Sequence, residues 1–211
     1  MSQRKADAER TRELILDAAE ITFLAQGLSR STLADIAKAA GVTRGAIYWH
    51  FEDKAAVFDA LLERVRTPLD EIVDDALEKN GTTPEICIRN IAKHALKAIC
   101  YDLALQRAAT IVFHRCEKLE DDHPRISMFT RLSEHSEAKV ESLFEQVQLA
   151  GNLRAGLTPA IACRQFHAFM IGVCFDWLQD IRKYALADEI DCIVETLMLG
   201  LLVQPLAAES E

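Results

Sequence analysis

The feature that most constrains the fold is a helical apolar period that is interrupted twice within the first 51 residues. The first run predicts a helix over about 8–26, which Gly27 ends. Its apolar face consists of Ile15, Ala18, Ala19, Thr22 and Phe23. Thr32 and Asp35 then have the spacing of a capping box, which predicts that a second helix begins here. Its apolar face is formed by Leu33, Ile36, Ala37 and Ala40.

A third helix has room only between Thr43 and about Trp49. Gly41 stands where a helix ends in a left-handed residue, and Thr43 can cap the helix that follows. Seven residues are too few for a helix that is stable alone, so packing must impose its conformation. Two helices joined by a tight glycine-containing turn predict a helix-turn-helix over about 32–51.

The period of the third helix separates a buried face from an exposed one. Ile47 and Phe51 should point, with Val42, toward the first two helices. The outward positions near its N-terminus are Arg44, Gly45, Ala46 and Tyr48. Such positions of a recognition helix meet base edges in the major groove, where an arginine can pair with guanine through two hydrogen bonds.

Two features of this helix allow more than one interpretation. Gly45 costs about 1 kcal/mol of helix propensity relative to alanine, so it calls for close approach either to DNA or to another helix. Tyr48, Trp49 and His50 offer O–H and N–H donors that suit phosphates. The alternative for the two aromatic residues is a place in the core.

The net charge of −9 at first argues against a nucleic-acid partner. Residues 1–60, however, hold 8 Lys and Arg against 9 Asp and Glu, so −8 of the total lies in the remainder, which holds 16 against 24. Within 36–51 the only charged residues are Lys38 and Arg44, and the cations Arg4, Lys5, Arg10 and Arg12 lie earlier in the chain. Because local charge governs phosphate contact, the N-terminal part can bind DNA.

Beyond residue 53 the sequence is helical throughout, which predicts an all-α protein of about nine helices in two domains, 1–53 and 54–211. The later helices are expected at about 54–79, 84–100, 103–117, 124–150, 159–182 and 188–203, with a frayed tail from 207. Thr67-Pro68, Thr83-Pro84 and Thr158-Pro159 each resemble a helix start. Pro68 would otherwise lie inside a long helix, which must then either kink or stop and restart at Thr67.

Several classes of function find no support in the sequence. The six cysteines, at 87, 100, 116, 163, 174 and 192, contain no CxxC pair, and buried reduced thiols explain them. His114 and Cys116 lack a second pair at zinc-finger spacing, so no metal and no cofactor is predicted. No secretory signal or membrane span is apparent, so a cytoplasmic protein is expected. No catalytic constellation is found, which argues against the alternative of a helical small-molecule enzyme.

Residues 32–62, TLADIAKAAGVTRGAIYWHFEDKAAVFDALL, closely resemble the signature of the tetracycline-repressor (TetR) family. The resemblance implies base contacts from Arg44, Gly45, Ala46 and Tyr48. It implies phosphate contacts from Thr32, Thr43, Trp49, His50 and Lys54. For Lys54, the backbone N–H and the ammonium are both expected on one phosphate. TRGAIYWHF, together with FHRCE at 113–117, is most similar to AcrR-type repressors of multidrug efflux pumps.

The same resemblance implies a dimeric repressor that binds a palindromic operator and that a small molecule releases. Ligand contacts are implied for Ala109, Phe113, His167, Met170, Ile171 and Cys174, with ordinary core packing as the alternative for each. The two C-terminal helices would form the dimer interface, which charges at Val173 or Leu197 should break. An acidic ligand domain with aromatic residues suits a bulky apolar or cationic, drug-like inducer. The alternative function is regulation of another pathway, such as lipid or aromatic metabolism.

Overall fold

The computed structural model describes residues 3–78, 82–115 and 125–203, with side chains described from residue 136 onward in the last range. Across these ranges the chain forms nine α-helices and one π-helical segment, so the all-α prediction is confirmed. The elements are α1 (Gln3–Gln26), α2 (Leu33–Ala40), α3 (Arg44–His50), α4 (Lys54–Glu78), α5 (Pro84–Tyr101), α6 (Leu103–Thr110), η1 (Ile111–Arg115), α7 (Arg125–Leu149), α8 (Pro159–Gln179) and α9 (Leu186–Leu201). Cys116 and the tail from 207 to 211 lie outside the described residues.

The chain divides into two compact units at Val65 and Arg66, within α4. The first unit comprises Met1–Val65 and Ala104–Met128, and the second comprises Arg66–Leu103 and Phe129–Glu211. The first unit therefore extends beyond the helix-turn-helix and takes in α6 and η1. The functional boundary expected at residues 53 and 54 stays a prediction.

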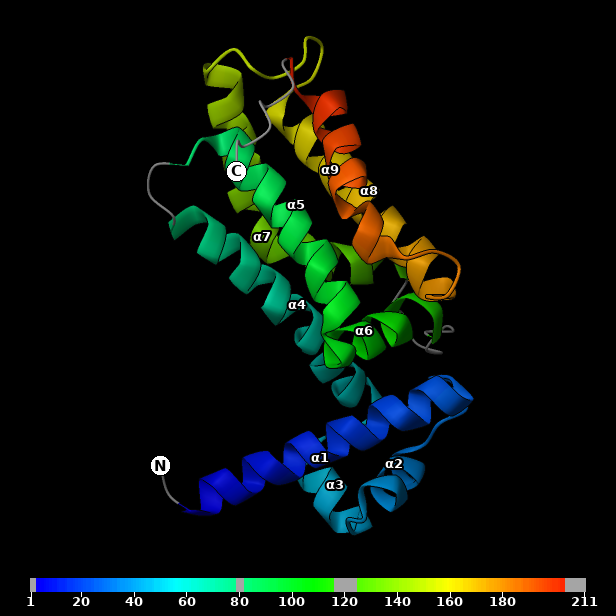
Figure 1. The fold of residues 1–211 in the computed structure, drawn as a ribbon. Coiled ribbons are helices and arrows are strands. Elements are labelled where there is room, and N and C mark those ends of the chain that lie inside the picture. Colours follow the sequence, from blue (N-terminus) through cyan, green and yellow to red (C-terminus); the bar gives the residue numbers. More distant parts are fainter. Residues whose placement is uncertain (1–2, 79–81, 116–124, 204–211) are drawn as a thin grey trace. The chain divides into compact units, whose positions relative to one another are not determined.

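In the first unit, α1 lies across α2 and α3 (Figure 1). The predicted face of α1 is buried, with Ile15 and Phe23 completely covered. Ile36 of α2, Ile47 of α3 and Leu61 of α4 complete this core. The fully buried apolar side chains hold α3 in place, as expected for a helix too short to be stable alone.

The turn between α2 and α3 has the geometry that its residues predict. Thr32 and Asp35 make both bonds of the capping box at the start of α2. Gly41 ends α2 with φ of 68°, a left-handed conformation that glycine adopts without steric cost. The hydroxyl of Thr43 accepts a hydrogen bond from the Ala46 N–H at 3.1 Å and so caps α3. The helix-turn-helix is thereby fixed by local hydrogen bonds.

Three expectations about helix boundaries need correction. Thr67 does not start a helix, because α4 continues through Pro68 from Lys54 to Glu78. The helix expected over 103–117 is α-helical only to Thr110 and then widens into η1. The helix expected to end at 182 ends at Gln179, where Asp180 follows in an extended conformation.

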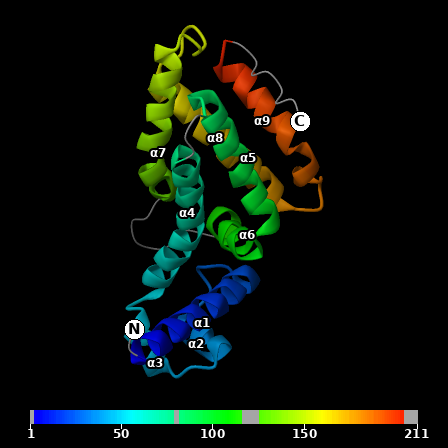
Figure 2. The same cartoon turned by 60° about the vertical axis from the view of Figure 1, so that its left-hand side comes forward.

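The second unit is a helical bundle around one apolar core. In Figure 2, α5 runs beside α8, with α7 and α9 on either side of this pair. Ile88, Ala92 and Leu96 of α5 are buried with Phe144 of α7 and Val194 of α9. Thr83 and Thr158 cap α5 and α8 with Pro at the first position, as predicted. No helix in the described ranges is long and apolar enough to cross a membrane.

Candidate nucleic-acid interface

The recognition helix α3 is held by its apolar side and exposes the other. Ile47 is 0% exposed and Phe51 is 3% exposed, so these two side chains anchor the helix as predicted. Arg44 and Gly45 are exposed, Ala46 is half-buried, and Tyr48 is 53% exposed. The side chains expected to meet bases are therefore accessible or partly accessible. Their contacts with DNA remain predictions.

Gly45 does not serve close packing between helices of this chain. A Cβ atom placed on Gly45 would meet only the hydroxyl oxygen of Thr43, at 3.9 Å, which is an ordinary van der Waals distance. Nothing in the fold of the described chain therefore requires a glycine here. Of the two interpretations of Gly45, close approach to another helix finds no support, and close approach to DNA remains supported.

Trp49 is a surface residue, so the alternative that placed it in the core is wrong. It is 72% exposed, and its ring meets the His50 ring edge-on with centroids 4.5 Å apart. A planar ring held at the surface and carrying an N–H donor suits a phosphate or sugar contact. The exposure of Trp49 therefore favours the phosphate role that the family resemblance implies.

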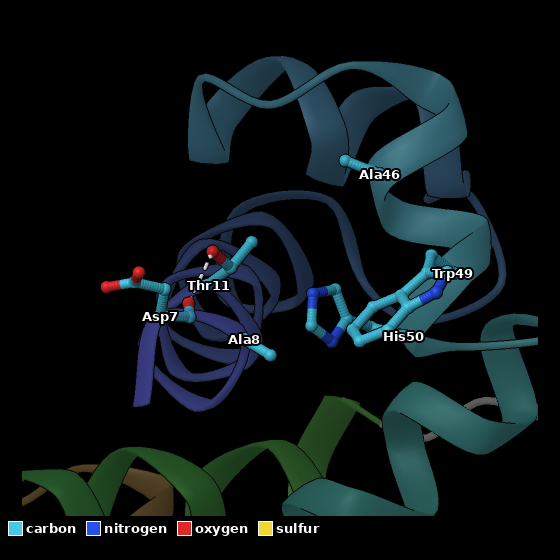
Figure 3. Close-up of a pocket in the computed structure, with 6 residues that line it drawn as sticks. All are labelled: Asp7, Ala8, Thr11, Ala46, Trp49 and His50. Atoms are coloured by element: carbon cyan, nitrogen blue, oxygen red, sulfur yellow. Dashed lines mark hydrogen bonds between the residues drawn. The ribbon is translucent and has the colours of Figure 1, made fainter. Parts of the chain in front are cut away.

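A groove separates α1 from α3 on this face (Figure 3). Its lining residues are Asp7, Ala8, Thr11, Ala46, Trp49 and His50. His50 projects from α3 toward α1. Burial in the groove lowers the pKa of His50, the charge of Arg12 lowers it further, and Glu9 opposes both. The ring is therefore held mostly neutral near pH 7 in the free protein.

The remaining predicted phosphate ligands are engaged inside the first unit. The Thr32 hydroxyl donates to Oδ2 of Asp35 at 2.6 Å, within the cap of α2. The Lys54 ammonium donates to three main-chain carbonyl oxygens in the α1–α2 connection, those of Leu28 (2.8 Å), Ser29 (3.2 Å) and Ser31 (3.0 Å). An ammonium has three N–H donors, so these bonds use all of them. In the free protein Lys54 therefore ties α4 to that connection, a role that the sequence did not reveal.

Arg12 supports the recognition helix from α1. Its guanidinium lies 5.3 Å from the centroid of the ring of Phe51, the residue that ends α3. A cation over an aromatic face contributes about 0.5–1 kcal/mol at a partly exposed site. The exposed cations Arg4, Lys5, Arg10, Lys38 and Arg44 remain available to solvent on α1, α2 and α3.

The six expected ligand residues fall into both compact units. Ala109 and Phe113 are buried in the first unit, on α6 and η1. The other four lie on α8 in the second unit: Met170 is buried in the core, whereas His167, Ile171 and Cys174 are half-buried. Core packing accounts for Met170 in this structure. The ligand role of all six stays a prediction.

A short helix follows a glycine-containing turn and exposes an arginine and aromatic side chains. This arrangement defines a helix-turn-helix DNA-binding protein. Residues 15–61 match the family described as bacterial regulatory proteins of the tetR family. Residues 83–202 match the C-terminal region of MAATS-type transcriptional repressors. The chain therefore belongs to the TetR family, a family of bacterial transcriptional regulators.

Known proteins resemble this chain over nearly its whole length. The HTH-type transcriptional repressor BepR of Brucella suis biovar 1 (strain 1330) is 32% identical over 95% of this chain and 96% of its own. NalD, the secondary repressor of the MexAB-OprM multidrug efflux pump in Pseudomonas aeruginosa, is 33% identical with a TM-score of 0.83, over 94% of this chain and 99% of NalD. SmeT, the repressor of the Stenotrophomonas maltophilia multidrug efflux pump SmeDEF, is 27% identical to this chain. The structure of its complex with triclosan has a TM-score of 0.79 and covers 96% of this chain and 98% of the SmeT chain.

Proposed function

We propose that the protein is a dimeric repressor that binds a palindromic operator in the cytoplasm and that a drug-like molecule releases. The observation that carries this proposal is the uncovered face of α3, where Arg44, Gly45 and Tyr48 are exposed on a helix anchored by two buried residues. The proposed regulated genes encode a multidrug efflux pump, because NalD and SmeT are repressors of such pumps. The proposal assigns no catalytic step to the chain.

Contacts with the operator divide into those that read sequence and those that do not. Arg44, Gly45, Ala46 and Tyr48 are proposed to meet base edges from the start of α3. Thr32, Thr43, Trp49 and His50 are proposed to contact the phosphates on either side. For Lys54, the main-chain N–H at the first turn of α4 is the proposed phosphate donor, because the ammonium already bonds three carbonyls.

Dimerisation is proposed along one face of α8 and α9. The large exposed apolar residues on these helices are Ile161, Phe175 and Leu199. Gly172 of α8 and Gly200 of α9 are not buried, and a Cβ at either would meet nothing within 4 Å. Each of these glycines costs helix propensity, and no described residue of the chain packs closely enough to either of them to require a glycine. Close contact with a second copy supplies the missing reason and gives the two half-site contacts that a palindrome needs.

The inducer is proposed to bind beyond the helix-turn-helix, within residues 54–211. The proposed contacts in the second unit are His167, Met170, Ile171 and Cys174, and Ala109 and Phe113 are proposed separately in the first unit. Most of them are apolar. One solved structure of SmeT, a relative of this chain, is its complex with triclosan. Triclosan is therefore a suitable first probe. A ligand releases DNA only by binding the DNA-free conformation more tightly than the DNA-bound one.

The test measures DNA binding by fluorescence anisotropy on an operator selected from random duplex DNA. Arg44→Ala should weaken operator binding by roughly 5- to 150-fold, a loss of about 1–3 kcal/mol, and leave random DNA little affected. Lys38→Ala, which removes an exposed cation from α2, is the control and should weaken both DNAs equally. Triclosan should then dissociate the wild-type complex. Equal losses on both DNAs for Arg44→Ala would contradict the proposed reading surface.

A further inference from the structure

Three potential metal ligands from two helices meet in the second unit. Cys163 and His167 lie on α8, and Glu137 lies on α7. One ligand atom from each, a thiol sulfur, a ring nitrogen and a carboxylate oxygen, lies within 4.8 Å of the other two. Cys163 is buried, and the other two side chains are half-buried. No role in the proposed operator contacts uses this cluster.

The helices place these residues together for simple geometric reasons. Cys163 and His167 are four residues apart on α8, so their side chains stand one above the other on one helix face. The Sγ atom of Cys163 lies 3.6 Å from Nδ1 of His167. The same sulfur lies 3.6 Å from the main-chain carbonyl oxygen of Glu137, which shows how closely α7 approaches this turn of α8.

The sulfur–nitrogen distance fits a tetrahedral zinc ion. With Zn–S near 2.3 Å and Zn–N near 2.0 Å, two ligand atoms at a tetrahedral angle stand about 3.5 Å apart. The observed 3.6 Å between Sγ and Nδ1 therefore needs no movement of α8. An oxygen of the half-buried Glu137 carboxylate lies within 4.8 Å of both atoms, so this side chain is the one that has to move closer when the ion binds.

We propose that Glu137, Cys163 and His167 bind one divalent cation of the zinc class and thereby link α7 to α8. A thiolate, an imidazole and a carboxylate together favour Zn²⁺ over the hard cations Mg²⁺ and Ca²⁺. Three protein ligands leave a fourth position, which water occupies in sites of this kind. The site shares His167 with the proposed inducer contacts but none of the proposed operator contacts. Metal binding is measured directly, so a failure of the proposed regulatory function would not affect its test.

Metal binding at this site should release a proton, and this release can be measured. In the metal-free protein burial raises the pKa of Cys163 to about 12, with the charges of Glu137 and Glu141 on α7 acting in the same direction and Arg164 on α8 opposing them. Burial lowers the pKa of His167, which keeps its ring neutral and able to coordinate, although Glu137 opposes this shift. The ion must displace the thiol proton, so one proton is released per ion bound and affinity rises with pH.

The test uses full-length protein without a histidine tag, stripped of metal by a chelator and kept reduced. Cobalt(II) is the probe, because a thiolate bound to it gives charge-transfer absorption in the near-ultraviolet. We expect saturation at one Co²⁺ per chain, displacement of Co²⁺ by Zn²⁺, and a higher melting temperature with Zn²⁺ present.

Variants separate a metal site from an ordinary thiol–imidazole hydrogen bond. Cys163→Ser keeps a hydroxyl that can bond Nδ1 but removes the sulfur ligand, so the charge-transfer band should vanish. His167→Gln and Glu137→Gln should each weaken binding by about tenfold or more. Cys192→Ser, which removes an exposed thiol on α9, is the matched control and should bind as the wild type does. Circular dichroism of each metal-free variant checks that it is folded.

Two outcomes would overturn the proposal. One is a wild-type protein that gives no thiolate-to-cobalt band at saturating Co²⁺. The other is a band that persists in Cys163→Ser, because the coordinating sulfur then belongs to another cysteine.

Discussion

The guanidinium of Arg64 on α4 lies 2.5 Å from Oε1 of Glu20 on α1, a carboxylate that is only 1% exposed. Two more carboxylates of α1 reach the same guanidinium, Glu13 at 2.5 Å and Asp17 at 2.9 Å. The other oxygen of Glu20 accepts from Nε of Arg107 on α6, at 3.3 Å. Burial would lower the pKa of Arg64, but the hydrogen bonds to Glu13, Glu20 and Asp17 outweigh it and raise that pKa. The buried charge of Glu20 is thus matched by two arginines.

We expect Glu20→Ala to lower the free energy of unfolding by about 3 kcal/mol, because it leaves Arg64 partly buried without its most buried partner. Asp17→Ala removes a carboxylate that is 62% exposed from the same guanidinium and should cost less than about 1 kcal/mol. Urea unfolding followed by circular dichroism measures both. Equal losses for the two variants would mean that the burial of Glu20 does not set the strength of the network.

The Lys54 side chain is expected to stabilise the fold, and to affect DNA binding through the fold rather than through a phosphate contact of its ammonium. Lys54→Met keeps most of the apolar stem but removes the donors to the carbonyls of Leu28, Ser29 and Ser31. We expect a loss of about 1–3 kcal/mol in unfolding free energy and weaker binding to all DNA sequences. The slope of log affinity against log salt should stay unchanged. A slope that falls by about one would show instead that the ammonium neutralises a phosphate in the complex.

Local sequence signals predicted most of the fold. The capping box at Thr32, the left-handed Gly41 and the Thr43 cap each depend on residues within a few positions, and all are present. The same holds for the buried anchors Ile47 and Phe51, whose positions follow from helical periodicity. The start of η1 after Thr110 had no such signal, because apolar spacing in so short a segment does not distinguish the wider π-helical turn from an α-helical one.

Contacts between residues far apart in sequence could not be predicted. Lys54 bonds residues 23–26 positions earlier in the chain, and Arg64 bonds residues more than 40 positions earlier. Their partners depend on how helices pack, which a single sequence does not reveal. Glu137 likewise joins Cys163 and His167 only because α7 passes beside α8. Cys163 and His167 stand four residues apart, and that spacing was the one available signal for the cluster.

His50 should make operator binding depend on pH. Burial, helped by Arg12, lowers its pKa in the free protein below the ordinary value of about 6.5. A nearby phosphate favours the charged ring, so the pKa must be higher in the complex and the protein takes up a proton on binding. Affinity should therefore rise as pH falls from about 7 toward the lower pKa of the free protein, and then level off.

The matched variants are His50→Gln and His94→Gln, the latter at an exposed position on α5. Anisotropy titrations between about pH 5.5 and 8 should lose their pH dependence in His50→Gln and keep it in His94→Gln. If the wild-type affinity does not change over this range, His50 does not contact a phosphate.

One of the two test positions that the sequence suggested for the dimer interface, Leu197, needs to be replaced. Leu197 is only 6% exposed and packs in the core of the second unit, so a charge there would disrupt the fold. Leu199 is 49% exposed on the same helix. Leu199→Glu should therefore yield a folded monomer that loses operator binding. Sedimentation velocity measures the mass, and circular dichroism checks the fold.

Gly172→Leu offers an independent test of the same interface. A Cβ atom there would meet nothing within 4 Å among the described residues, so we expect the fold to tolerate the side chain or gain up to about 1 kcal/mol of helix propensity. A second copy packed closely on α8 would be pushed away. We expect dissociation at concentrations where the wild type is dimeric. A dimer as tight as the wild type would move the interface elsewhere.

Pro68 connects the two halves of α4, three residues beyond the last residue of the first compact unit, Val65. It has no N–H, so the carbonyl of Arg64 one turn earlier receives no helical hydrogen bond from it. The sequence left a mobile bend and a fixed kink as alternatives. Because α4 is continuous through Pro68, the helix does not stop and restart at Thr67. Arg64 is also the centre of the buried charge network, which holds the first part of α4 to α1. Any bending of α4 should therefore concentrate at the unbonded turn between Arg64 and Pro68.

Pro68→Ala restores that hydrogen bond and should stiffen this turn. We expect the DNA-free variant to bind triclosan with nearly wild-type affinity but to need more of it for release from the operator, since stiffening acts on the coupling rather than on the ligand site. Calorimetry on the free protein and anisotropy on the operator complex measure the two quantities. Thr67→Ala, which changes the neighbouring residue without adding a main-chain N–H, is the control. If Pro68→Ala leaves both values at those of the wild type, the proline only shapes α4 and ligand binding reaches α3 by another route.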